Sequence, residues 1–447
     1  MKDILKTIIR EFHTEDLPSL IKRDLSFPLD SGKIITLVGP RRAGKTYLFY
    51  QHIRELLVKG VPKEKILYLN FEDERLDLTP QTLDLILQAY RELYPELDLR
   101  ECYFFFDEVQ NAEGWERFTR RLYDRISRNI FLTGSNSKLL SQEIATSLRG
   151  RILKYEVFPL NFKEFLRFKN FDFDLERDFY SPRKKAQLIH HFEEYLSFGG
   201  FPEVVFLPRE LKLKTLQEYF EVMLYRDLVE RYQIKDTLVL KYFLKRLVEN
   251  TGKILSVHKI YNELKSQGIR VGKDTLYRYL EYAENVYFVR LLRKHYRSLV
   301  KSELAEKKVY LIDPGLLRSI RFLGDREKGI LLENTIFKEL LISGADVVYF
   351  KGKRECDFIV NGKLAVQVSY DLSDEDTLKR EIEGLKEACK YFGLKEGVIV
   401  TFGQEKLLER DLPIQISIIP AYIFIQIYLI FSSIIFLFQF LLSNFTK

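Results

Sequence analysis

Residues 33–46 read KIITLVGPRRAGKT, and this stretch decides the fold of the N-terminal part of the chain. An apolar run leads into a loop that starts at Gly39 and ends at Gly44, and Lys45 and Thr46 follow directly. Glycines let such a loop point its backbone N–H groups at phosphate oxygens, a lysine reaches the β- and γ-phosphates, and a hydroxyl group ligates Mg²⁺. The stretch therefore predicts a strand, a phosphate-binding loop and a helix.

The loop as a whole is predicted to bind a nucleotide, and the expected ligands are ATP and Mg²⁺. Its members are Gly39, Pro40, Arg41, Arg42, Ala43, Gly44, Lys45 and Thr46. Whether Arg41 and Arg42 face phosphate or a partner subunit is left open by the sequence.

The second half of the site is predicted where the apolar run at 103–106 leads into Asp107 and Glu108. We expect Asp107 to hold Mg²⁺ directly or through water, together with Thr46. Glu108 is expected to orient the attacking water as a base, and Lys45 is the second predicted catalytic residue. The alternative for Glu108 is a cap on the following helix.

Two polar segments further along the chain are candidates for additional catalytic groups. Ser135 or Asn136, in TGSNS at 133–137, is predicted to sense the γ-phosphate, and a turn satisfied by its own hydroxyl groups is the alternative. Arg149 and Arg151 are predicted to neutralise charge in the transition state, in the same chain or across a subunit interface. Ordinary surface arginines are the alternative.

Length and composition limit the number of domains and the class of protein that the chain can form. A chain of 447 residues is too long for one ordinary core, so about three domains are expected. Lysine and arginine total 71 against 64 acidic residues. This small excess of positive charge is a weak hint of anionic partners, and a salt-bridged surface is the alternative explanation. Three widely spaced cysteines without a C-x-x-C pair, and an N-terminus without a long apolar run, favour the cytoplasm.

Periodicity predicts an α/β organisation followed by helices and then a second α/β region. The first strands are expected at Ile34–Val38, Ile66–Asn70, Tyr103–Phe106, Ile130–Thr133 and Leu153–Val157. A helical pattern follows to about Leu247 and suggests a lid or adaptor. Helical periods at Val257–Gln267 and Asp274–Asn285, followed by the β-rich run Tyr287–Leu292, suggest a winged helix.

These motifs together resemble the archaeal ATPase family of AAA-like and STAND-type P-loop proteins. The resemblance is carried by GPRRAGKT at 39–46, FFFDEVQ at 104–110, FLTGSNSKLLS at 131–141, SLRGR at 147–151, FPLNFKEFL at 158–166 and GGFPEVV at 199–205. It implies a P-loop NTPase parallel sheet in the order 5-1-4-3-2, a helical lid, a winged helix and a C-terminal restriction-endonuclease-like α/β domain. The expected boundaries are 1–160 for the ATPase domain, 161–239 for the lid or adaptor, 240–300 for the winged helix, 301–425 for the nuclease-like domain and 426–447 for an apolar tail.

The resemblance also implies that Gly199, Gly200 and Pro202 contact the nucleotide base from the lid. An ordinary turn at the end of a helix is the alternative, because glycine and proline punctuate any chain. Arg226 and Asp227 match the family pattern as well, but no chemical role can be assigned to them.

The winged helix is a candidate DNA-binding element, because the second helix of such a domain enters the major groove. The basic residues that would form this surface are Lys273, Arg278, Arg290, Arg293 and Lys294. Packing on the nucleotide domain as a switch element is the alternative, since fold alone does not prove function.

The nuclease-like domain is expected to be inactive. It offers Glu333 and Asp357 as acids, but Gln367 and Ser369 stand where an active member of the resembled fold places glutamate and lysine. Gln367 lacks a charge for Mg²⁺, and Ser369 cannot replace an ammonium group near the attacked phosphate. A degenerate fold used for binding or packing is therefore expected.

The C-terminal tail is nearly free of charge, since no charged residue lies between Asp411 and Lys447. Residues 426–442 are close to the lower length limit for a membrane span. Three interpretations remain open: a membrane anchor, a helix buried against the body or a partner, and an atypical extension of the reading frame.

Two functional hypotheses of different classes follow, with a third less favoured. The first is an ATPase switch, in which ATP closes the lid and winged helix and hydrolysis reopens them. The second is an ATP-gated DNA-binding regulator with negligible turnover, and the third is a Mg²⁺-dependent nuclease. A protein client and an oligomer are also left open.

Overall fold

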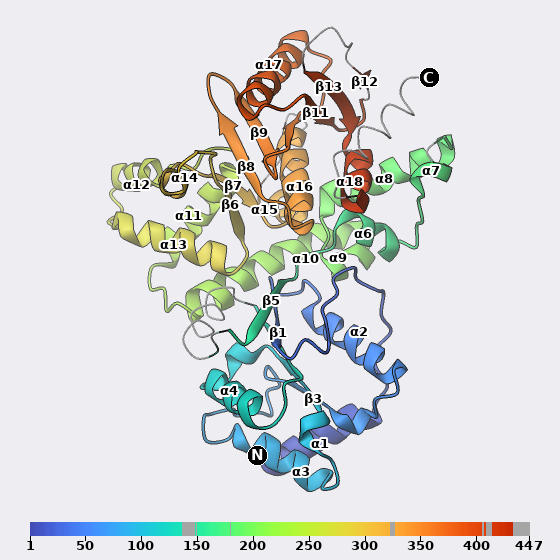
Figure 1. The fold of residues 1–447 in the computed structure, drawn as a ribbon. Helices are drawn as coiled ribbons and strands as arrows, with labels where there is room; N and C mark the ends of the chain where they lie inside the picture. Colours follow the sequence, from blue (N-terminus) through green and yellow to red (C-terminus); the bar gives the residue numbers. More distant parts are fainter. Residues whose placement is uncertain are drawn as a thin grey trace. The chain divides into compact units, whose positions relative to one another are not determined.

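The computed structural model describes residues 1–135, 148, 150–178, 180–321, 327–404, 406–407 and 414–431. These divide into two compact units. The first unit comprises residues 1–158 together with 285–287, and the second comprises residues 159–284 and the chain from 288 onward. Each unit is described separately, and Figure 1 labels many of the elements of both.

The first unit is built on a five-stranded parallel sheet. Its strands are β1 (Ile34–Val38), β2 (Ile66–Asn70), β3 (Tyr103–Asp107), β4 (Ile130–Gly134) and β5 (Ile152–Glu156). The spatial order is β2-β3-β4-β1-β5, which confirms the expected order 5-1-4-3-2. All residues of β1 and β4 are buried, because helices cover both faces of a parallel sheet and its central strands need apolar residues throughout.

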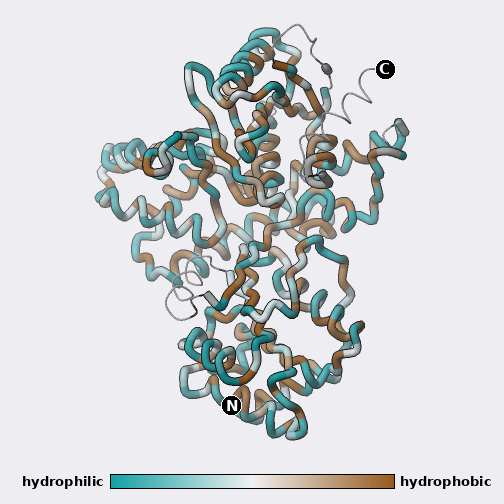
Figure 2. Tube along the Cα trace, viewed as in Figure 1, coloured by the Kyte–Doolittle hydropathy of each residue, from teal (hydrophilic) through white to brown (hydrophobic). Residues whose placement is uncertain are grey.

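Helices surround this sheet. They are α1 (Lys2–Thr14), α2 (Lys45–Val58), α3 (Asp84–Leu93) and α4 (Trp115–Arg125), with short 3₁₀ turns at Lys63–Lys65, Leu99–Glu101 and Val109–Asn111. Helix α2 buries Phe49 and Ile53 against Phe105 and Phe131 of the sheet. Figure 2 shows the resulting pattern of hydrophobic strands and largely hydrophilic outer helices. The loop between β1 and α2 is therefore anchored at both ends by a well-packed core.

The second unit begins with a helical region. Its elements are α6 (Phe162–Phe168), α7 (Leu175–Asp178), α8 (Pro182–Phe198), α9 (Pro202–Phe206), α10 (Arg209–Val222), a π-helical segment (Met223–Glu230) and α11 (Thr237–Glu249). A capping box starts α6: Asn161 Oδ1 accepts from the N–H of Glu164 at 2.7 Å, and Glu164 Oε2 accepts from the N–H of Asn161 at 3.2 Å. The region predicted as a lid is thus helical, as its periodicity indicated.

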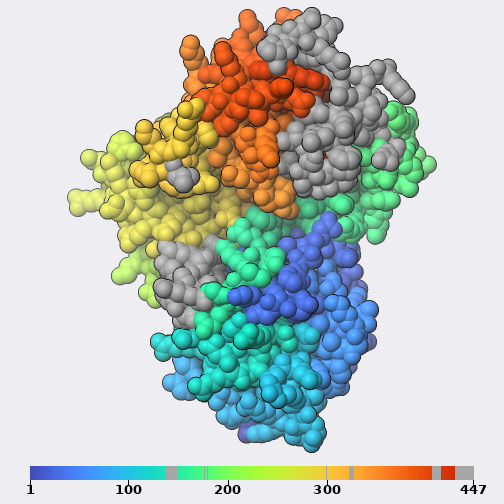
Figure 3. All heavy atoms as spheres, viewed as in Figure 1, coloured from blue at the N-terminus to red at the C-terminus, as the bar shows by residue number. Residues whose placement is uncertain are grey.

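Two further helices and a small antiparallel sheet follow. They are α12 (Val257–Ser266), α13 (Lys273–Asn285), β6 (Val289–Leu292), α14 (Leu299–Leu304) and β7 (Lys308–Leu311), with β6 paired to β7. This order of elements is compatible with a winged helix, and that assignment stays a prediction. The surface of this segment is seen in yellow in Figure 3. Residues 285–287, which join α13 to β6, group with the first unit, and the Tyr287 hydroxyl donates to Glu156 at the end of β5 over 3.0 Å.

The remaining elements form a second sheet with helices on it. They are α15 (Pro314–Ile320), α16 (Lys328–Ile342), β8 (Val347–Lys351), β9 (Glu355–Val360), β10 (Leu364–Val368), α17 (Glu375–Phe392), β11 (Glu396–Thr401), β12 (Lys406–Leu407) and β13 (Gln415–Pro420). The order is β12-β13-β11-β10-β9-β8, with parallel pairing of β10 to β11 and of β11 to β13. This C-terminal α/β sheet was predicted, whereas the two residues of β12 are too few to show a sequence pattern.

Helix α18 (Ala421–Phe431) follows β13 without a gap. Its residues from Ala421 to Ile427 are buried, which agrees with packing of this helix against α16, α8 and the second sheet. None of the helices in the described ranges is both long and apolar enough to cross a membrane. Residues 432–447, which include most of the predicted tail, lie outside the described residues.

Candidate nucleotide site

The loop between β1 and α2 has a backbone that only particular residues can adopt. A Cβ atom on Gly39 would overlap the carbonyl oxygen of Val157, so this position admits only glycine. Gly44 has a φ of 92° and Arg42 a φ of 63°, both in the left-handed region that favours glycine. Pro40 and Ala43 complete the turn, and the Ala43 N–H donates to the Pro40 carbonyl at 3.4 Å.

Arg23 supports this loop from outside it and was not foreseen from the sequence. Its guanidinium donates to the Ala43 carbonyl at 2.9 Å and to the Phe158 carbonyl at 3.0 Å, and the side chain is 7% exposed. Gln51 of α2 accepts from the N–H of Arg23 at 2.8 Å. A buried arginine that bonds two carbonyls can fix the loop, but no motif marks it in the sequence.

Lys45 lies inside the loop rather than on the surface. It is 4% exposed, and its Nζ donates to the carbonyls of Gly39 at 3.2 Å and Pro40 at 3.1 Å. The same Nζ lies 3.2 Å from Glu108 Oε1. The lysine of the loop and the predicted base at the end of β3 therefore form a buried ion pair.

Asp107 and Thr46 lie side by side, as a Mg²⁺ site requires. Thr46 Oγ1 donates to Asp107 Oδ2 at 2.6 Å, Tyr68 donates to the same oxygen at 3.2 Å, and Thr133 donates to Oδ1. Burial, and then the charge of Glu108, raise the pKa of Asp107. A bound cation would oppose both effects.

This donor set fits Mg²⁺ held with help from a nucleotide. The described residues contain no cluster of three histidine, cysteine or carboxylate side chains that alone could hold a metal. Mg²⁺ in nucleotide sites usually takes one or two protein oxygens and completes its shell with phosphates and water. Thr46 and Asp107 supply such a pair.

Glu108 is held in one orientation by its neighbours. Its N–H donates to Thr133 Oγ1 at 2.8 Å, and its Oε2 accepts from Gln110 Nε2 at 2.6 Å. Burial tends to raise the pKa of Glu108, but Lys45, Gln110 and Arg41 outweigh it and hold the pKa below its usual value. Although Glu108 precedes a 3₁₀ turn, its side chain makes no capping hydrogen bond there, which argues against a mere cap.

Ser135 extends this network, since Gln110 Nε2 also donates to Ser135 Oγ at 3.3 Å. Ser135 is 1% exposed and lies directly after β4, the neighbour of both β1 and β3. Arg41 pairs with Glu72 across 2.8 Å. Asn136 and Arg149 lie outside the described residues.

Arg151 is not close to the loop of its own chain. It directly precedes β5, its carbonyl accepts from the N–H of Ile34 at the start of β1, and its Nε lies 3.0 Å from Asp124 Oδ1. The phosphate loop is at the other end of β1, and five strand residues span roughly 16 Å. This geometry argues against the same-chain role considered for Arg151, because the side chain is too short to cover this distance. A role across a subunit interface stays a prediction.

Gly199 and Gly200 lie in the second unit, where close packing accounts for both of them. A Cβ atom on Gly199, whose φ is 72°, would overlap Asp313, and a Cβ atom on Gly200 would overlap the carbonyl of Leu160. The N–H of Gly200 donates to Asp313 Oδ2 at 2.9 Å, and this oxygen also pairs with Lys338 at 2.8 Å. Pro202 opens α9. Contact of Gly199, Gly200 and Pro202 with a nucleotide base stays a prediction.

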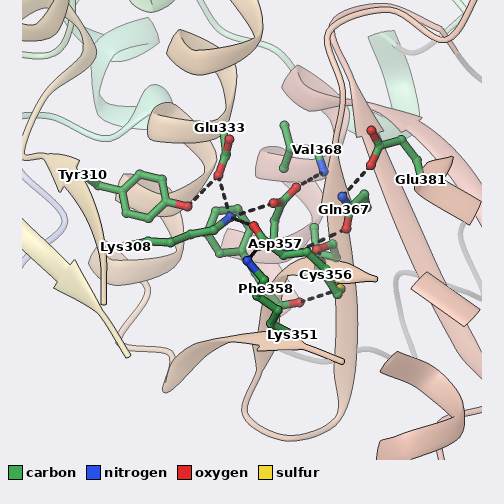
Figure 4. Close-up of polar contacts among 12 residues, drawn as sticks. Lys308, Tyr310, Glu333, Lys351, Cys356, Asp357, Phe358, Gln367, Val368 and Glu381 are labelled. Carbon is green, nitrogen blue, oxygen red and sulfur yellow. Dashed lines mark hydrogen bonds and ion pairs between the residues drawn. The ribbon is translucent and has the colours of Figure 1, made fainter. Parts of the chain in front are cut away.

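Acidic residues of the nuclease-like domain come together around a lysine that was not foreseen, as Figure 4 shows. Lys308 of β7 is 2% exposed, and its Nζ lies 2.8 Å from Glu355, 3.0 Å from Asp357 and 3.4 Å from Glu333. Burial, and then the charge of Asp357, raise the pKa of Glu333 to about 7. The ammonium group of Lys308 therefore supplies the positive charge that the clustered carboxylates need. The only signal in the sequence that could have marked Lys308 is its position directly before the apolar run VYLI at 309–312.

The two positions that depart from an active nuclease make structural contacts. Gln367 Nε2 donates to Glu381 Oε2 at 2.5 Å, and its Oε1 accepts from the N–H of Asp357 at 3.2 Å. The Ser369 hydroxyl donates to the Asp371 carbonyl at 3.1 Å. Glu333 and Asp357 therefore both lie near Lys308, and Gln367 contacts the backbone of Asp357, so the three residues share one network of protein contacts.

The sheet order and the loop site define an AAA-type P-loop nucleotide-binding domain. A protein family described as an AAA domain matches residues 31–166, and a family described as a domain of unknown function matches residues 189–327. An uncharacterized protein of Methanocaldococcus jannaschii is 38% identical over 416 residues, covering 90% of each chain. An uncharacterized protein of Haemophilus influenzae is 33% identical over 351 residues, covering 77% of this chain and 84% of its own. The chain belongs to the archaeal-type family of P-loop ATPases.

Two solved structures share parts of this arrangement at low similarity. The Walker-type ATPase of Pyrococcus abyssi is 17% identical, with a TM-score of 0.42 over 69% of this chain and 99% of its own. AMPPCP-bound DnaA of Aquifex aeolicus is 15% identical, with a TM-score of 0.24 over 63% of this chain and 86% of its own. Likenesses this distant carry no argument about what the chain does.

Proposed function

We propose that the chain is a Mg²⁺-dependent ATPase whose cycle of ATP binding and hydrolysis drives a conformational switch. The observation that supports this most is the continuous buried network that joins Lys45 and Thr46 of the loop to Asp107 and Glu108 of β3. Each of these groups has the chemistry that phosphoryl transfer to water requires, and β1, β3 and β4 hold them together.

In this mechanism the Lys45–Glu108 ion pair is exchanged when ATP binds. The ammonium of Lys45 leaves Glu108 Oε1 for the β- and γ-phosphates, and the Glu108 carboxylate becomes available to a water molecule. Gln110 keeps the other oxygen of Glu108 fixed, so the carboxylate orients that water instead of rotating. Thr46 and Asp107 would hold Mg²⁺, which would supply charge neutralisation at the phosphates.

The path of the chain between α13 and β6 supports a conformational switch, as the nucleotide site does. Residues 285–287 group with the first unit, and they continue directly into α13 on one side and β6 on the other. A change at the end of β5 that affects the Tyr287–Glu156 hydrogen bond would therefore act on the segment between α13 and β6. A protein client and an oligomeric form are further proposals for what such a switch acts on.

Phosphate release by wild type, Lys45→Ala and Glu108→Gln tests the enzyme assignment. We expect Lys45→Ala to lose both binding of a fluorescent ATP analogue and turnover. Glu108→Gln should keep binding and lose turnover by about 10²-fold or more. Lys59→Ala, an exposed lysine just after α2, is the matched control. Equal rates of phosphate release in all four proteins would refute the proposal.

A second candidate function, an ATP-gated DNA-binding regulator, is favoured by the exposed face of α13. Lys273 and Arg278 are both exposed there, and Arg278 donates to Thr275 of the same helix at 3.3 Å. Of the predicted wing residues, Arg293 pairs with Glu303 at 2.7 Å, which competes with a phosphate. A duplex-DNA mobility shift that weakens with salt and is lost in Lys273→Ala/Arg278→Ala would support this function. Unchanged binding in that double variant would exclude α13 as the contact.

A further inference from the structure

A cavity in the second unit plays no part in the loop site. Its volume is about 550 Å³, and α8, α10, α15, α16 and the segments after β10 and β11 contribute to its wall. Helices α8 and α10 both pack against α15. Ligand sites in proteins usually measure about 300–1,000 Å³, so the cavity has the size of a site for a small molecule.

Two arginines without a carboxylate partner among the described residues line this cavity, the half-buried Arg318 and the exposed Arg209. The guanidinium carbon of Arg318 lies 5.4 Å from the centre of the Phe198 ring, and that of Arg209 lies 5.9 Å from the same ring. Within the described residues, neither guanidinium has a carboxylate at ion-pair distance. Burial, and then the charge of Arg209, lower the pKa of Arg318, as expected when like charges meet without a counter-ion. An anion would remove this repulsion.

The remaining charged groups of the wall leave the excess positive. Lys212, 3% exposed, and Lys169 both bind Glu194, at 3.2 Å and 2.7 Å, so that carboxylate is already neutralised. Glu193 is the other acid of the wall, and its side chain is exposed on α8. The cavity is therefore suited to an anionic ligand and not to a cationic one.

Another part of the wall is aromatic. Tyr370 and Phe402 stack with their ring centres 4.9 Å apart and an interplanar angle of 20°, and the N–H of Phe402 donates to the Tyr370 carbonyl at 3.2 Å. These residues follow the parallel strands β10 and β11. In open α/β sheets, ligands bind beyond the carboxyl ends of parallel strands. Both residues line the cavity, so a planar ligand bound there would lie next to their rings.

We propose that this cavity is a second ligand site, which binds a nucleoside phosphate. Arg209 and Arg318 bind the phosphate, and the Tyr370–Phe402 pair packs against the base. A phosphate alone would leave the aromatic wall unused, and a neutral nucleoside would leave the two arginines uncompensated. The site is separate from the loop at Gly39–Thr46, which needs the β- and γ-phosphates of its ligand.

AMP is the probe that distinguishes the two sites, because it has no β-phosphate for Lys45. Calorimetric titration of the full chain with AMP should show binding in wild type and in Lys45→Ala. Arg209→Gln and Arg318→Gln should each weaken AMP about ten- to hundredfold, as expected for loss of a charge-assisted hydrogen bond. Arg183→Gln, an exposed arginine at the other end of α8, is the matched control and should bind as wild type does.

Titrations with other ligands distinguish a nucleoside phosphate from the alternative ligands. Adenosine and inorganic phosphate should each bind more weakly than AMP, and a circular dichroism melt must show that each variant is folded. Loss of AMP binding in Lys45→Ala with retention in both arginine variants would overturn the proposal, because the ligand would then occupy the loop. Inorganic phosphate binding as tightly as AMP would overturn the assignment of the aromatic wall. Binding of a single-stranded oligonucleotide without binding of AMP would assign the cavity to nucleic acid instead.

Discussion

The buried ion pair between Lys338 and Asp313 allows a quantitative test of what stabilises the second unit. The two side chains are 1% and 0% exposed, and the nitrogen–oxygen distance is 2.8 Å. In Lys338→Met the aliphatic volume is nearly kept, while Asp313 loses its cation in a site closed to water. Breaking a buried pair in this way typically costs about 3–5 kcal/mol.

For Lys338→Met, the structure indicates a loss of stability at the lower end of that range. Asp313 keeps two backbone donors, the N–H groups of Gly200 and Gly315, each at 2.9 Å. We therefore expect a loss of about 3 kcal/mol in the free energy of unfolding. With a urea slope of about 1–3 kcal/mol/M, the midpoint of the second unit should fall by roughly 1–3 M.

The assay can report on the two units separately. Trp115 is the chain's single tryptophan and lies in α4 of the first unit, whereas far-UV circular dichroism follows the helices of both. Lys338→Met should shift the dichroism transition while the Trp115 fluorescence transition stays in place. Asp313→Asn added to Lys338→Met removes the uncompensated charge and should restore part of the loss. Lys390→Met, an exposed lysine on α17, is the control, and a dichroism midpoint of Lys338→Met equal to that of the control would refute the reasoning.

Three further changes have definite expected outcomes. Burial is the main cause that raises the pKa of Glu339 to about 7, so its folded form keeps a proton that the unfolded form has lost. Stability should then fall by roughly 3 kcal/mol as pH rises from about 4.5 to 7, and Glu339→Gln should flatten this dependence in urea titrations at several pH values. Gly39→Ala should weaken binding of a fluorescent ATP analogue at least about tenfold, because the new Cβ overlaps the Val157 carbonyl and displaces the loop, whereas Gly403→Ala, in open space, should not. Lys308→Met leaves Asp357 and its neighbouring acids without their cation and should lower the urea midpoint by a similar amount to Lys338→Met, less so at pH 5, where Glu333, whose pKa is raised to about 7, carries a proton.

The ATPase core could be predicted closely because each of its signals is local. The strands Ile34–Val38 and Ile66–Asn70 occur with the predicted bounds, since continuous apolar runs bounded by glycine or polar residues specify buried parallel strands. The pairing of Asp107 with Thr46 follows from the same logic: β3 lies in the sheet at the carboxyl edge where the loop begins. For Arg151 the sequence left several roles open for a geometric reason. Its motif gives its position in sequence, but not the end of β5 at which it lies.

Buried lysines show where sequence reasoning reaches its limit. Lys45, Lys212, Lys308 and Lys338 are 4%, 3%, 2% and 1% exposed, and each lies close to a carboxylate that is distant in sequence. Average hydropathy places every lysine on the surface, since an unpaired buried ammonium is unstable. What makes burial possible is a partner brought in by the fold, such as Asp313 for Lys338. Only Lys45 lies in a recognised motif, and that motif predicted contact with phosphate and not an ion pair. Lysines next to or within apolar runs, such as Lys308 and Lys338, should therefore be examined as candidates for buried ion pairs.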